Sequence, residues 1–80
     1  MNRDKLRFEN IRNAIWHAST VKDVIAEYCS NKPQRIRAEY IRQLTKWAHF
    51  LYKGNLQKTK DRFLRMLNVD EQNYYESMDK

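Results

Sequence analysis

The sequence predicts an all-α protein: a compact bundle of four helices, with a short fifth C-terminal helix as one of two open interpretations of the tail. Turn-forming residues are scarce, since the 80 residues include one glycine and one proline, and β-proteins need such residues in their tight turns. Apolar residues instead recur at the three- and four-residue spacing of amphipathic helices. At this length we expect one domain spanning 1–80.

The first two helices are expected over 4–18 and 21–29. In the first, Phe8 and Ile15 belong to an apolar face whose members fall on one side at 100° per residue. The second begins after Thr20, which is followed three residues later by an acidic residue. That pairing is typical of a helix N-cap, because the hydroxyl oxygen accepts a free backbone N–H and the acid lies in the first turn.

The third and fourth helices are expected over 33–53 and 56–68. Pro33 suits the first turn of a helix, where its missing N–H costs nothing. Gly54 supplies the left-handed residue that ends many helices, and Asn55 is a suitable N-cap for the next. Seven apolar residues of the third helix share one arc, which we expect to face the core: Ile36, Tyr40, Ile41, Leu44, Trp47, Ala48 and Leu51.

The C-terminal segment has two interpretations of nearly equal weight. A short helix over 71–78 would begin at Asp70 as its N-cap, and Val69 with Tyr74 has the spacing of a hydrophobic staple. A frayed tail is the alternative, since chain ends are often poorly ordered.

Net charge is distributed unevenly along the chain. Residues 1–30 hold five basic and four acidic side chains, a net charge of +1. Residues 31–65 hold ten basic against two acidic side chains, a net charge of +8, and residues 66–80 hold one basic against four acidic, a net charge of −3. A basic middle segment of this kind favours a polyanionic partner.

The basic residues of the third and fourth helices also form stripes opposite the expected apolar sides. We call these stripes the basic ribbons, and their members are Arg35, Arg42, Lys46, Lys53, Lys58, Arg62 and Arg65. If the two helices pack as neighbours, the ribbons merge into one positive surface. An equally weighted alternative is that the ribbons are only solvated helix faces, which are commonly charged.

Four aromatic residues are candidate interaction anchors: Trp16, Phe50, Tyr74 and Tyr75. Trp16 lies off the apolar side of its helix, yet in a small bundle we favour its being covered by the second or fifth helix. Phe50 lies at the edge of the third helix's apolar arc, where core packing is the favoured interpretation and base stacking the alternative. Tyr74 and Tyr75 would either dock on the protein's own basic face or bind a partner.

Catalytic and metal chemistry find no support in the residue pattern. His17 and His49 have no cysteine or carboxylate at ligand spacing, and Cys29 ends an apolar face, where a small buried hydrophobe is the expected role. We therefore expect no enzyme activity, no cofactor and no metal site. A single cysteine and the absence of a long apolar run predict a cytoplasmic protein without a membrane span.

These observations predict a small, non-enzymatic, regulatory protein that binds DNA or RNA through the basic ribbons. The alternative is a protein-binding inhibitor or adaptor that docks on an acidic or nucleic-acid-binding surface of a larger protein, through the same ribbons or Trp16. A weaker variant of the first places the second and third helices as a helix-turn-helix, in which the residues entering the groove of a duplex would be Gln34, Arg35, Glu39 and Arg42. Homodimerisation is a further expectation, because bundles this small often need added burial.

Overall fold

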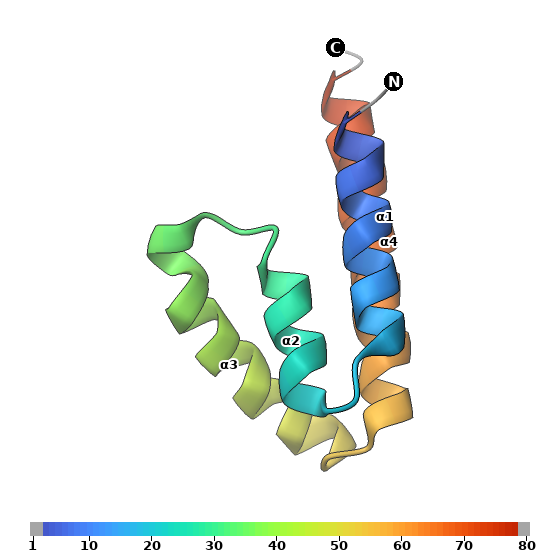
Figure 1. Ribbon diagram of the computed structural model, residues 1–80. Coiled ribbons are helices and arrows are strands. Elements are labelled where there is room, and N and C mark those ends of the chain that lie inside the picture. The colour runs from blue at the N-terminus through green and yellow to red at the C-terminus, as the bar shows by residue number, and fades with distance from the viewer. Residues whose placement is uncertain (1–2, 79–80) are drawn as a thin grey trace.

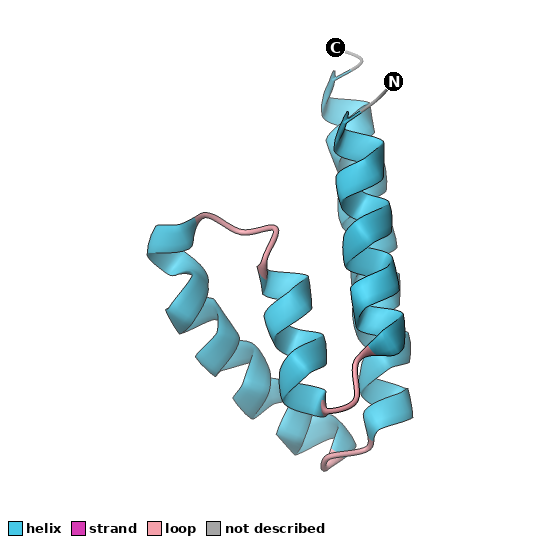
Figure 2. Cartoon of the chain, in the orientation of Figure 1, coloured by secondary structure: helices cyan, strands magenta, loops and turns pink. Residues whose placement is uncertain are grey.

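The computed structural model describes residues 3–78, which form four α-helices and no strand (Figures 1 and 2). The helices are α1 (Arg3–His17), α2 (Val21–Cys29), α3 (Gln34–Tyr52) and α4 (Leu56–Met78). The predicted all-α class is confirmed. Figure 1 shows α1 and α4 antiparallel and side by side, with α2 beside them and α3 diverging from the other helices.

Two of the predicted helix starts are fixed by side chains that cap them. Thr20 Oγ1 accepts the backbone N–H of Asp23 at 3.1 Å, so it is the N-cap of α2. Asn55 Oδ1 accepts the backbone N–H of Lys58 at 2.9 Å, which caps the start of α4. Both caps satisfy N–H groups that have no partner within the helix, and both were predicted from the sequence.

The turn between α3 and α4 uses two left-handed residues. Lys53 has φ 51° and is the C-cap of α3, and Gly54, which was expected in this conformation, follows with φ 83°. Glycine adopts such angles without the steric penalty that a Cβ brings. Pro33 precedes α3 as its N-cap residue, one position before the first turn in which it was predicted.

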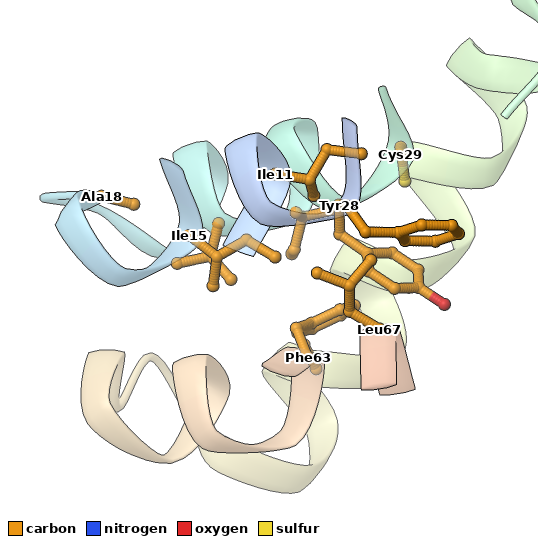
Figure 3. Close-up of a cluster of buried hydrophobic side chains, with 11 residues drawn as sticks. Ile11, Ile15, Ala18, Tyr28, Cys29, Phe63 and Leu67 are labelled. Atoms are coloured by element: carbon orange, nitrogen blue, oxygen red, sulfur yellow. The ribbon is translucent and has the colours of Figure 1, made fainter. Parts of the chain in front are cut away.

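The hydrophobic core lies mainly between α1, α2 and α4 (Figure 3). Residues from all three helices are fully or almost fully buried there, and they are Phe8, Ile11, Ile15, Val24, Ile25, Tyr28, Cys29, Phe63 and Leu67. The apolar face predicted for the first helix is therefore the face that packs. Burying such a side chain stabilises the fold by about 1.5–3 kcal/mol.

The prediction that the apolar arc of α3 faces the core is confirmed for its middle, where Tyr40, Ile41, Leu44 and Trp47 are partly buried against the core, and is wrong at its two ends. Within that arc Ala48 alone is buried, whereas Ile36 is 44% exposed and Leu51 is 47% exposed. The reason is geometric: α2 has 9 residues and cannot cover the 19 residues of α3, and α3 diverges from α4 beyond the turn at Gly54 (Figure 1). The two ends of the apolar arc are therefore left exposed.

A separate fifth helix and a frayed tail are both wrong, because α4 is continuous from Leu56 to Met78. Asp70 lies inside this helix and does not cap its start. The residues around it include no proline or glycine, so nothing forbids the helix from continuing. Side chains of α1 also hold the C-terminal half: the Arg12 guanidinium donates to Asn68 and Glu71.

Candidate nucleic-acid interface

The basic ribbons are exposed along their whole length, and their members line different hollows. Lys58, Arg62 and Arg65 line hollows on the side of α4 that faces α3. The ribbon of α3 lies roughly opposite the buried Ala48, at 100° per residue. The hollows that the α4 ribbon lines therefore contain Tyr40 and Tyr52 of α3 and no residue of the α3 ribbon.

Between α3 and α4 lies an open hollow of about 520 Å³, which we call the α3–α4 groove. Its lining residues come from α2, α3 and α4, and they are Tyr28, Tyr40, Arg62, Arg65, Met66, Val69 and Asp70. A smaller hollow of about 160 Å³ adjoins the groove through Arg62 and Arg65, and it adds Tyr52, Lys58 and Asp61. All three basic residues of the α4 ribbon therefore lie along one connected depression.

Arg62 is held in place by an aromatic side chain of α3. Its guanidinium carbon lies 5.4 Å from the centroid of the Trp47 ring, a cation–π contact worth about 0.5–1 kcal/mol at an exposed site. Trp47 is itself held edge-on against Phe63 and Tyr52, at centroid distances of 6.0 and 6.3 Å. Neither Arg62 nor Arg65 forms an ion pair within residues 3–78, so both are available to an anion.

Lys32 adds a positive charge at the α2–α3 loop. Its ammonium nitrogen lies 5.8 Å from the ring centroid of Tyr28 and 5.3 Å from that of Tyr40. Both rings line the α3–α4 groove. Lys32 was not singled out from the sequence, because it stands in a loop and belongs to neither ribbon.

The ribbon of α3 is partly neutralised. Arg42 forms an ion pair with Glu39, one turn earlier, whereas Lys46 and Lys53 form no ion pair within the described chain. Arg35 lines a shallow hollow that also contains Ile36, Glu39, Tyr40 and Gln43. This surface is therefore a weaker anion site than the ribbon of α4.

Two of the candidate anchors are more exposed than the sequence suggested. Trp16 is 58% exposed and Phe50 is 79% exposed, so the expectation that both are packed is wrong. The backbone carbonyl of Trp16 accepts a hydrogen bond from Lys60 Nζ at 2.7 Å, which fixes the end of α1 beside α4 without covering the indole. Both rings remain open to contact.

Tyr74 and Tyr75 pack on α1 and not on the basic ribbons. Their ring centroids lie 5.7 and 6.3 Å from that of Phe8, and the Tyr74 hydroxyl donates to Asp4 at 2.6 Å. The predicted docking of these tyrosines on the protein's own basic face is therefore wrong. Instead, they fasten the C-terminal half of α4 to α1.

Two residues that line the α3–α4 groove share a partly buried hydrogen bond. The Tyr28 hydroxyl, at the rim of the core cluster (Figure 3), donates to Asp70 Oδ2 at 2.5 Å. Burial raises the pKa of Tyr28 above its ordinary value, and the hydrogen bond to the carboxylate raises it further. The protonated hydroxyl thus ties α2 to α4.

We expect Tyr28→Phe to lower the free energy of unfolding at neutral pH by about 1.5–3 kcal/mol, because it leaves the half-buried Asp70 without its donor. A raised folded-state pKa means that this stabilisation is complete below the unfolded tyrosine pKa of about 10 and declines as pH rises above it. Denaturant titrations at several pH values should therefore show the gap between parent and variant narrowing above about pH 10. A gap independent of pH would contradict the assignment.

The residues with catalytic potential are not assembled into a site. His17 and His49 are exposed and lie on different helices, and Cys29 is buried. Burial raises the pKa of the Cys29 thiol, which keeps it protonated and unreactive. Among residues 3–78 no group of histidine, cysteine or carboxylate side chains is placed to hold a metal ion.

Comparisons with protein-family models, with curated proteins and with solved structures find no match to this chain. Among the helices of residues 3–78, none combines the length and the apolar character needed to cross a membrane. What the α3–α4 groove binds is therefore inferred from its own residues.

The place of Tyr40 in the lining of this groove was not predicted from the sequence. Tyr40 and Trp47 stand seven residues apart on one side of α3 and were predicted to face the core, and both do pack against it. How close these two rings lie to the basic ribbon of α4 depends on the tertiary structure. The sequence signal that would have identified them is the mixture of aromatic and basic residues in the 31–65 segment.

Proposed function

We propose that the protein is a small, non-enzymatic nucleic-acid-binding protein that uses the basic faces of α3 and α4. The observation that carries this proposal is the pair Arg62 and Arg65 on one wall of a concave groove, with neither engaged in an ion pair within the described chain. A guanidinium offers a planar set of donors that matches phosphate geometry. Trp47 orients Arg62 before any ligand arrives.

The charge distribution supports the same partner. The net charge of +8 over residues 31–65 contrasts with −3 over residues 66–80, so a polyanion is attracted to one region of the molecule. Lys58 extends the α4 contacts, while Lys46 and Lys53 on α3 offer a second, weaker surface for the backbone. Because a binder of this size acts by occupying its target, we propose a regulatory role, and a reducing cytoplasmic setting for the buried thiol of Cys29.

A second candidate function is docking on a larger protein. The observation that favours it is the exposure of Trp16 and Phe50, since tryptophan is enriched among the anchors of protein interfaces. Trp16 lies on α1, away from the residues that line the α3–α4 groove, so this function would use a different surface.

We expect Arg65→Glu to weaken binding to a mixed-sequence oligonucleotide by at least about tenfold, because a charge-assisted contact to phosphate is replaced by repulsion. The slope of log affinity against log salt should fall by about one. Fluorescence anisotropy across a salt series measures both quantities. Since Arg65 is exposed, its free energy of unfolding should stay within about 0.5 kcal/mol of the parent.

The matched control is Arg3→Glu, the same reversal at the exposed start of α1, which lies outside the α3–α4 groove. It changes net charge equally and should change affinity far less. If the two variants lose affinity equally, binding is unspecific attraction to net charge. If the parent binds no oligonucleotide at low salt, nucleic-acid binding is the wrong function, and capture of a protein partner that Trp16→Ala abolishes would establish the second candidate.

A further inference from the structure

The α3–α4 groove combines basic side chains, which suit a phosphate backbone, with aromatic and apolar side chains, which a phosphate backbone alone does not require. Its α4 wall carries Arg62 and Arg65, followed toward the C-terminus by the apolar Met66 and Val69. Opposite them stands Tyr40 of α3, which lines both this groove and the neighbouring shallow hollow. Tyr40 therefore stands between two depressions and is half-buried.

We infer that this groove binds an unpaired nucleotide of a single strand, with the base stacked on Tyr40 and the adjoining phosphates on Arg62 and Arg65. The inference rests on the proposed function and names its substrate class. Aromatic rings beside basic residues are the arrangement that single strands use, because every unpaired base has an apolar face to stack. A duplex stacks its bases internally and presents phosphates outward, so it would leave the apolar wall uncovered.

Charge within the groove sets the polarity of the bound nucleotide. Asp70 lies at one part of the lining, where its carboxylate accepts the Tyr28 hydroxyl, and a carboxylate repels phosphate. The phosphates therefore lie toward Arg62 and Arg65, and the base lies toward Tyr40. Lys32, above the rings of Tyr28 and Tyr40, supplies a positive charge for the next phosphate along the strand.

The structure gives the duplex-reading alternative less support. A helix-turn-helix arrangement of α2 and α3 needs Glu39 and Arg42 free to contact base edges, but these side chains pair with each other. The guanidinium carbon of Arg62 instead lies 5.4 Å from the centroid of the Trp47 ring, and guanidinium groups are also platforms on which bases stack.

The test compares one single-stranded oligonucleotide of about 12 nucleotides, as DNA and as RNA, with the duplex made by annealing its complement. We expect the parent to prefer the single strand. Tyr40→Leu should weaken single-strand binding by about 5- to 150-fold and leave duplex binding unchanged, while Tyr40→Phe, which keeps the ring, should bind like the parent. Tyr75→Leu is the matched control, since Tyr75 is also half-buried but packs on Phe8 of α1.

A second measurement decides the case if Tyr40→Leu fails to fold. The chain has two tryptophans, so Trp16→Phe leaves Trp47 beside Arg62 as the only indole. Its fluorescence should change when the single strand binds and not when the duplex is added at the same concentration.

The outcomes separate this inference from the proposed function. Equal or tighter binding of the duplex, or an effect of Tyr75→Leu as large as that of Tyr40→Leu, overturns the single-strand assignment while nucleic-acid binding stands. Competition by polyglutamate as effective as that by the single strand shows that charge alone is recognised, and it also overturns the assignment. Failure of every polynucleotide to bind defeats both.

Discussion

We expect Phe63→Ala to lower the free energy of unfolding by about 3–5 kcal/mol, the range for truncating a buried phenylalanine. The Phe63 ring is fully buried and lies edge-on to Tyr28 of α2 and Trp47 of α3, with centroid distances of 5.2 and 6.0 Å. Three helices therefore meet at this ring, and a cavity there cannot be closed by moving one of them. Denaturant unfolding followed by far-UV circular dichroism measures the change.

Phe50→Ala is the matched control. It is the same substitution on a neighbouring helix, but the Phe50 ring is 79% exposed, so its removal should change the free energy of unfolding by no more than about 0.5 kcal/mol. Similar losses from the two variants would mean that α3 packs with its other side inward. The α3–α4 groove would then not exist as described.

The parts of the fold that the sequence predicts are those fixed by neighbouring residues. The N-caps at Thr20 and Asn55 depend on side chains within three positions of their backbone partners, and the apolar face around Phe8 and Ile15 repeats along one helix. Both signals lie within a few residues of the structure they determine. They therefore survive whatever tertiary arrangement the helices adopt.

The exposure of the two ends of the α3 arc escaped prediction, because an apolar arc looks the same whether the partner helix is long or short. Ile36 and Leu51 share the periodicity of the buried Ala48, but α2 ends before it reaches the full length of the arc. Coverage depends on the lengths and crossing of other helices, which no local pattern contains.

The candidate site likewise has one part that the sequence predicts and one part that depends on the tertiary structure. The stripe of Lys58, Arg62 and Arg65 follows from helical spacing and was predicted, whereas the place of Tyr40 in the lining of the groove depends on how α3 diverges from α4. The partial neutralisation of Arg42 by Glu39 was accessible from the sequence, because residues three apart on a helix are neighbours.

The continuity of α4 leads to the second large effect. We expect Val69→Pro to lower the free energy of unfolding by about 3 kcal/mol or more, because proline in a helix interior removes a backbone hydrogen bond and clashes with the preceding turn. The Val69 side chain is 54% exposed, so the loss reports on the backbone and not on packing. Thermal unfolding and the helical far-UV signal of the two chains measure it.

Val69→Ala isolates the backbone effect, since it shortens the same exposed side chain and keeps the N–H; it should stay within about 0.5 kcal/mol of the parent. If α4 instead ended near Asn68 and a separate helix followed, proline at position 69 would lie in a linker and cost little. A tolerated proline would therefore contradict the single helix. In a continuous α4, proline at position 69 should also weaken the contacts of Arg12 with Glu71 and of Tyr74 with Asp4. Both contacts require the second half of α4 to continue along α1.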